Sequence, residues 1–169
     1  MKLDVLHRDP NQVIGIYENV CLIVRWARLT GADLEVHLRA LALLKRRHPR
    51  GIAVLQLNRF SPGPSTPGLD DAGQRVIHEV VRTHGSAVRL FALVLVDAPF
   101  WIAAIRSIYT RMAFLTKVQI DMRPFTDVHE AARTVYAVMK DPGQRTPEPA
   151  ELVAALAELE KQRPVDSPP

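Results

Sequence analysis

Three hydroxyl side chains in a stretch rich in proline and glycine are the first candidates for chemistry. The stretch reads Ser61-Pro62-Gly63-Pro64-Ser65-Thr66-Pro67-Gly68, and this composition predicts a loop. A phosphate on Ser65 or Thr66 would lie just before a predicted helix, whose dipole and free N–H groups favour negative charge. The candidate phosphorylation sites are therefore Ser61, Ser65 and Thr66. The alternative is that all three are ordinary loop residues. Because the stretch contains no lysine and its three prolines have no N–H group, it does not fit a nucleotide-binding P-loop.

The histidines and the single cysteine show no metal-binding or catalytic pattern. The histidines are His7, His37, His48, His78, His84 and His129, and no two have the spacing that places two ligands on one helix face. We interpret them as surface or helix-end residues. Cys21 lies in an apolar run, where a free cysteine behaves as a small hydrophobic residue. Neither Gly-x-Ser-x-Gly nor His-Glu-x-x-His occurs, so we expect no enzymatic site, no metal and no cofactor.

Basic residues gather in one short stretch near residue 48. The patch consists of Lys45, Arg46, Arg47 and Arg50. The formal net charge of the chain is only +4, which permits an anionic partner without demanding one. Proteins that bind nucleic acids usually add a reading helix or exposed aromatic side chains, and only 6% of this chain is aromatic. We therefore interpret the patch as the end of a helix, where positive charge complements the helix dipole, and expect no nucleic-acid partner.

The segment 100–115 has more apolar residues than one face of a surface helix needs. It is also rich in the residue types that are common at protein interfaces. The predicted interaction surface consists of Phe100, Trp101, Ala104, Ile108, Tyr109, Arg111 and Met112. The alternative is a larger intramolecular core that covers the same side chains.

Alternating strands and helices must position these groups. The β-branched and apolar runs predict strands at residues 13–17, 20–26, 52–57, 90–96 and 118–122. Glu18-Asn19 forms the expected tight turn of a hairpin, because asparagine tolerates positive φ. Helices are expected to begin near Thr30, Leu69, Pro99 and Thr126, with Thr30 and Thr126 as caps.

The resulting order is β-β-α-β-α-β-α-β-α with a further helix at the C-terminus. This order predicts an α/β domain whose mixed, mostly parallel sheet has an N-terminal antiparallel hairpin. The composition changes after Lys140. We therefore expect a domain over residues 1–140, followed over 141–169 by a proline-rich linker, a short amphipathic helix and a disordered end. With 169 residues, no apolar run of membrane-spanning length and no secretion signal, we expect a cytoplasmic protein.

Between Val13 and Lys140, this order of elements resembles the STAS domain, the fold of bacterial anti-sigma-factor antagonists. The resemblance implies a regulatory module that contacts other proteins. In phosphorylatable STAS domains, the modified serine follows an aspartate between the central strand and the next helix. The corresponding segment here, 58–68, is longer and proline-rich, and its hydroxyl residues precede the acidic pair Asp70-Asp71.

These observations together predict a non-enzymatic regulatory or scaffolding module that works in signalling by protein–protein interaction. We expect its partner to be another protein or a second copy of the chain, with a homodimer forming through the segment 100–115. The alternative is a domain that binds a small molecule or lipid in a pocket between that segment and the sheet.

Overall fold

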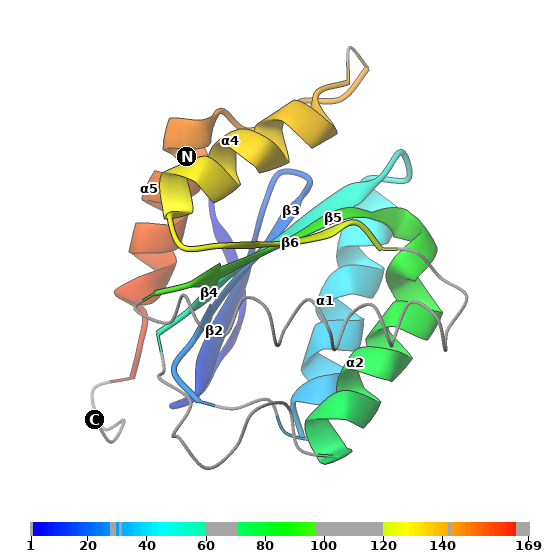
Figure 1. Cartoon of the computed structure of the whole chain (residues 1–169), viewed down its shortest axis with the longest axis vertical. Coiled ribbons are helices and arrows are strands. Elements are labelled where there is room, and N and C mark those ends of the chain that lie inside the picture. The colour runs from blue at the N-terminus through cyan, green and yellow to red at the C-terminus, as the bar shows by residue number, and fades with distance from the viewer. Residues whose placement is uncertain are drawn as a thin grey trace.

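The computed structural model describes residues 2–27, 30, 32–59, 71–96, 120–141 and 143–164. Over these residues the chain forms a six-stranded mixed sheet with helices on both faces (Figure 1). The strands are β1 (Asp4–Arg8), β2 (Gln12–Tyr17), β3 (Val20–Arg25), β4 (Ile52–Asn58), β5 (Val88–Leu95) and β6 (Met122–Phe125). The helices are α1 (Asp33–Arg47), α2 (Asp71–His84), α4 (Val128–Met139) and α5 (Pro149–Glu160), with a short 3-10 helix at Gly85–Ala87. The predicted fold class is therefore confirmed.

The strands lie in the sheet in the order in which they occur along the chain. β1, β2 and β3 pair antiparallel, and β3 to β6 pair parallel. Tyr17 pairs with Val20, so the hairpin between β2 and β3 has the expected two-residue turn. The positive φ of this turn, 52°, belongs to Glu18 and not to Asn19 as expected.

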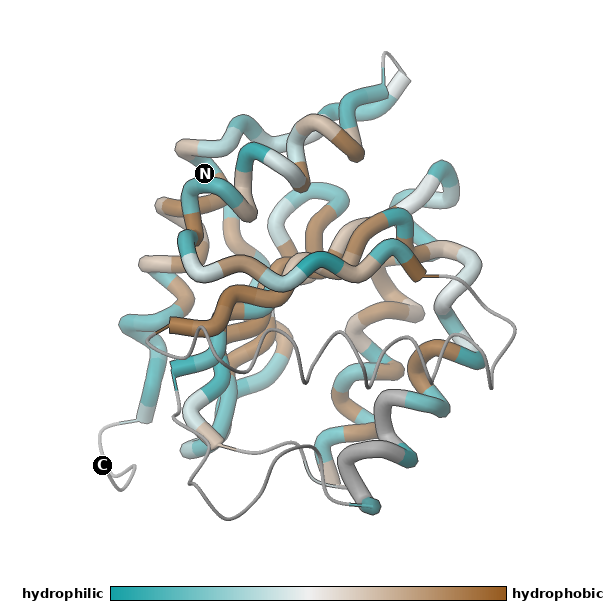
Figure 2. Tube along the Cα trace, viewed as in Figure 1, coloured by the Kyte–Doolittle hydropathy of each residue, from teal (hydrophilic) through white to brown (hydrophobic). Residues whose placement is uncertain are grey.

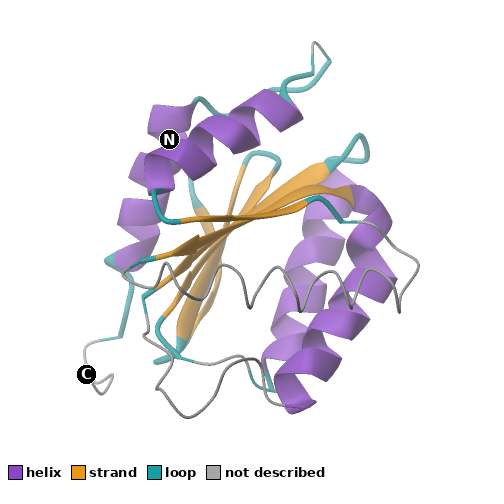
Figure 3. Cartoon of the chain, in the orientation of Figure 1, coloured by secondary structure: helices purple, strands orange, loops and turns teal. Residues whose placement is uncertain are grey.

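The helices form two layers, one on each face of the sheet (Figure 3). α1 and α2 lie on one face, where Leu41 and Leu44 of α1 pack with Ile14 and Ile23 of the sheet. α4 and α5 lie on the other face and pack against residues such as Leu22. Because the central strands are covered on both faces, most of their residues are apolar (Figure 2).

The C-terminal helix α5 packs on the sheet of its own chain. Its buried side chains are Leu152, Ala155, Leu156 and Leu159. Gly15 of β2 makes room for the helix, since a Cβ atom at this position would lie 3.0 Å from Cδ1 of Leu159.

The structure corrects several predicted boundaries. β1 was not expected, because its residues alternate poorly between polar and apolar. β6 begins at Met122 rather than at 118, and it contains Pro124, which an edge strand tolerates because one side needs no ladder hydrogen bond. The cap of α1 is Ala32 rather than Thr30, and Asp127 rather than Thr126 caps α4 by accepting from the backbone N–H of Glu130. Residues 118 and 119 lie outside the described part of the chain.

Candidate functional site

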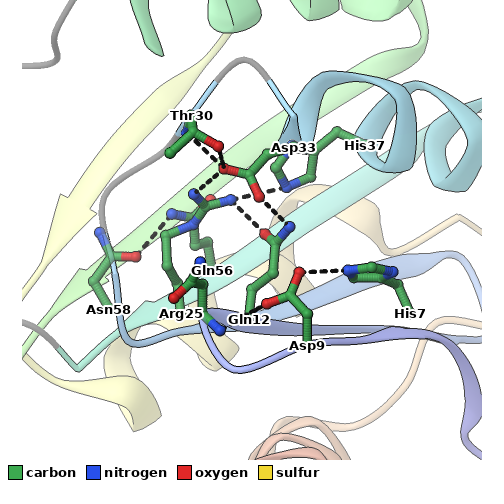
Figure 4. Close-up of polar contacts among 10 residues, drawn as sticks. His7, Asp9, Gln12, Arg25, Thr30, Asp33, His37, Gln56 and Asn58 are labelled. Atoms are coloured by element: carbon green, nitrogen blue, oxygen red, sulfur yellow. Dashed lines mark hydrogen bonds and ion pairs between the residues drawn. The ribbon is translucent and has the colours of Figure 1, made fainter. Parts of the chain in front are cut away.

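A cluster of buried polar side chains lies at the carboxyl ends of β3 and β4, on the face that α1 covers (Figure 4). Gln12 pairs with Arg25 in the sheet, and Arg25 pairs with Asn58. Residues opposite each other on neighbouring strands point to the same face, so these three side chains form one polar row. The first turn of α1 places Asp33 and, one turn later, His37 over this row. We call Gln12, Arg25, Asp33, His37 and Asn58 the polar cluster.

The Asp33 carboxylate is the main acceptor of the polar cluster. Its Oδ1 accepts a hydrogen bond from Nε2 of Gln12 at 2.6 Å. Its Oδ2 accepts from the backbone N–H of Thr30 at 2.6 Å and from the Thr30 hydroxyl at 3.1 Å, and lies 3.4 Å from Nη1 of Arg25. Asp33 also begins α1, where the helix dipole favours negative charge. A single buried carboxylate thus joins the ends of β2 and β3 to the start of α1.

The Arg25 guanidinium is buried, with 2% of its surface exposed. Its Nη2 donates to Oε1 of Gln12 at 2.5 Å and lies 3.0 Å from Nε2 of His37. Because a guanidinium has only donors, Nε2 of His37 must accept, which places the imidazole proton on Nδ1. Burial and the positive charge of Arg25 lower the pKa of His37 to about 3. His37 is therefore uncharged in the folded protein near neutral pH.

A second group of polar contacts borders the polar cluster on the side of β1 and β2. Nε2 of His7 lies 2.6 Å from Oδ2 of Asp9, and Oδ1 of Asp9 accepts the backbone N–H groups of Asn11 and Gln12. Burial raises the pKa of Asp9, but these hydrogen bonds, with that from His7 the largest, outweigh burial and lower it. On the side of β4, Nε2 of Gln56 donates to Oδ1 of Asn58 at 2.8 Å. These contacts hold the loop between β1 and β2 and the end of β4 in place.

The polar cluster pairs its charges internally, and its geometry fixes strand and helix ends. The segments 60–70 and 97–119 begin at this carboxyl edge, because β4 ends at Asn58 and β5 ends at Leu95, and the second segment leads to the start of β6 at the opposite edge. The carboxyl edge of parallel strands is also where α/β proteins usually contact their ligands. The polar cluster therefore forms a rigid base at the edge where the two segments with predicted contact residues begin.

The sequence did not point to the polar cluster. His37 was expected at the surface or at a helix end, and this is wrong because its ring is buried against Arg25. A signal was present in the sequence. Otherwise apolar strands carry polar residues near their ends, namely Gln12, Arg25, Gln56 and Asn58. Only the register of the sheet shows that these residues share a face.

The candidate residues predicted from the sequence fall into two groups. The basic residues Lys45, Arg46 and Arg47 form the last turn of α1, and Arg50 follows it, so the prediction of a basic helix end is confirmed. The other candidates lie outside the described residues: the hydroxyls Ser61, Ser65 and Thr66, and the predicted interaction surface of Phe100, Trp101, Ala104, Ile108, Tyr109, Arg111 and Met112.

Cys21 is buried as expected, and burial raises the pKa of its thiol to about 12. Among the described residues, no group of three or more His, Cys, Asp or Glu side chains could hold a metal ion. None of the helices in the same residues is sufficiently long and apolar to cross a membrane.

Comparison with known proteins gives no family for this chain. No protein-family model matches it, and no curated protein matches it either.

Proposed function

We propose that this chain is a non-enzymatic regulatory or scaffolding module that acts by protein–protein contact and self-associates through the segment 100–115. The observation that carries the proposal is the polar cluster at the carboxyl edge, which fixes strand ends through charges paired within the chain. The two segments in which the sequence predicts contact residues begin at that edge. A mixed six-stranded α/β sheet is also compatible with the resemblance to STAS domains.

The burial and pKa values of the described cysteine and of His37 favour a role in protein–protein contact over a role in catalysis. A nucleophilic cysteine needs a lowered pKa and access to solvent, whereas Cys21 is buried with its pKa raised to about 12. A general base works best with a pKa near the operating pH, whereas the pKa of His37 is lowered to about 3. The single, buried cysteine also suits the reducing cytoplasm, where we propose that the protein works.

Native mass spectrometry of the purified chain separates this proposal from the alternative. We expect the mass of a dimer with no added ligand. A monomer that carries the extra mass of a small molecule or lipid would contradict the proposal and support a ligand-binding domain.

Phosphorylation of Ser61, Ser65 or Thr66 is a further part of the proposed regulation. A phosphate in the segment before α2 would gain from the N-terminal end of that helix dipole. We expect peptides from residues 60–70 to carry a phosphate when the protein is isolated from its native cells. Peptides that are unmodified in every growth condition would remove this part of the proposal without affecting the dimer.

A further inference from the structure

Basic side chains from three parts of the chain lie at the amino edge of the parallel strands, at the end of the sheet opposite the polar cluster. Lys45 and Arg46 belong to the last turn of α1, Arg50 lies in the loop before β4, and Arg89 lies near the start of β5. The sequence places the first three together, and the fold adds Arg89. We call these four residues the basic edge.

Arg50 and Arg89 come from different segments of the chain but lie near the same carboxylate, that of Asp141. This carboxylate lies 3.9 Å from Nη1 of Arg50 and 4.0 Å from Nη2 of Arg89. Arg89 passes directly over Gly51, where a Cβ atom would lie 2.5 Å from its Nε. The φ of Gly51 is 127°, a conformation that favours glycine. The absence of a side chain at this position also leaves room for the Arg89 side chain.

The donors of the basic edge are available to a partner. Both contacts to Asp141 are longer than a hydrogen bond, and neither guanidinium donates a hydrogen bond within the part of the chain that the structure describes. Arg50 is 59% exposed and Arg89 is 42% exposed. Lys45 and Arg46 are also exposed, and neither has an ion pair among the described residues.

The positive charge of the basic edge exceeds what its surroundings neutralise. Of the four cationic side chains, Arg50 and Arg89 face the carboxylate of Asp141, and the C-terminal end of the α1 dipole supplies only about half a negative charge. The nearby carboxylates of Asp4 and Glu18 are used elsewhere, because they pair with Arg47 at 2.9 Å and with Arg145 at 3.1 Å.

We propose that the basic edge binds an acidic segment of a partner protein, rich in aspartate and glutamate. Guanidinium groups match carboxylates with two parallel hydrogen bonds, and the Arg50 and Arg89 donors are unused. A nucleic acid fits less well, because proteins that bind nucleic acids usually add a reading helix or exposed aromatic side chains, and only 6% of the chain is aromatic. The inference goes beyond the proposed function, since it adds a contact surface at the end of the sheet opposite the polar cluster.

Fluorescence anisotropy with two labelled probes tests the inference on the full chain. The probes are a short glutamate-rich peptide and a single-stranded DNA oligonucleotide of the same net charge. We expect the peptide to bind more tightly than the DNA, with an affinity that falls as salt is added. The combined change Lys45→Gln, Arg46→Gln and Arg50→Gln should weaken peptide binding about tenfold or more, as the loss of three modest charge contacts implies.

A charge-matched variant controls for net charge. Arg39, Arg75 and Arg133 are exposed and lie away from the basic edge, on α1, α2 and α4. Changing all three to glutamine should leave peptide binding within about twofold of wild type, since their charges are remote and screened. Equal losses in both variants, no peptide binding by wild type, or tighter DNA binding would each overturn the inference. None of these results would alter the oligomeric state, so they leave the proposed self-association untouched.

Discussion

Asp33 and Arg25 show how a buried ion pair can organise the end of a sheet. Both are almost fully buried, and both make further hydrogen bonds, to Gln12, Thr30 and His37. A buried pair of this kind adds little stability relative to apolar residues of the same size, but removing one partner leaves an uncompensated charge. The value of the pair therefore lies in fixing the start of α1 against β2 and β3.

The change Asp33→Ala should lower the free energy of unfolding by about 3 kcal/mol, because it leaves the Arg25 guanidinium buried without its carboxylate. Urea denaturation followed by circular dichroism measures the loss. The double change Arg25→Met with Asp33→Leu should recover part of it, because it removes the buried charge but leaves the Gln12 amide without these two partners. A double variant as unstable as Asp33→Ala would show that the charge is not the cause.

His37 should make the protein less stable in mild acid. Its pKa is about 3 when folded and has the ordinary value of 6.5 when unfolded. The unfolded chain therefore binds an extra proton as the pH falls below 6.5, and this pulls the equilibrium toward unfolding. Between about pH 7 and about pH 5, this one group should cost about 2 kcal/mol.

Denaturation curves of His37→Gln at the same two pH values test this prediction. Glutamine can accept the hydrogen bond from Arg25 but does not titrate. The loss of stability on acidification should shrink by about the amount assigned to His37. An unchanged loss would assign the acid sensitivity to other groups, such as His48 and His84, whose pKa values are also lowered by burial.

At the scale of elements, the contact between α5 and β2 depends on a glycine. In the change Gly15→Ala, the new methyl group would meet Cδ1 of Leu159 at 3.0 Å and the backbone oxygen of Asp4 at 3.3 Å. The crowding should lower the free energy of unfolding by about 1 kcal/mol, after the smaller gain from a stiffer unfolded chain.

A double-mutant cycle with Leu159→Ala identifies the cause of this loss. Because the shortened side chain no longer crowds the methyl group, Gly15→Ala should cost less in the Leu159→Ala background than in wild type. Equal costs in both backgrounds would show that α5 is not what the alanine meets.

The elements that the sequence predicted well are those with strong, continuous patterns. β3, β4 and β5 have long apolar runs because helices cover both of their faces, and the last turn of α1 is marked by its basic residues. β1 and β6 were missed or misplaced because edge strands are only half covered. His7 and Pro124 on these two strands indicate a loop when they are considered alone.

The polar cluster could not be predicted because it depends on register. Gln12, Arg25 and Asn58 are separated by many residues in the chain and share a face only through the pairing of three strands. The same limit applies to the basic edge, where Arg89 joins Arg50 through the fold alone.

For the whole molecule, the two ends of the sheet have different character. The carboxyl edge holds the polar cluster, with its charges paired inside the chain, and the segments 60–70 and 97–119 begin there. The amino edge carries the exposed basic edge. We propose that the module contacts an acidic partner at the basic edge and a second copy through the segment 100–115.

Multi-angle light scattering over a range of protein concentrations tests self-association most directly. We predict a dimer for wild type and a folded monomer for Trp101→Glu, because a buried charge at an interface is costly. Arg111→Glu provides a second variant that keeps the apolar residues, and far-ultraviolet circular dichroism confirms that each variant is folded. A wild-type protein that is monomeric at every concentration would contradict the account.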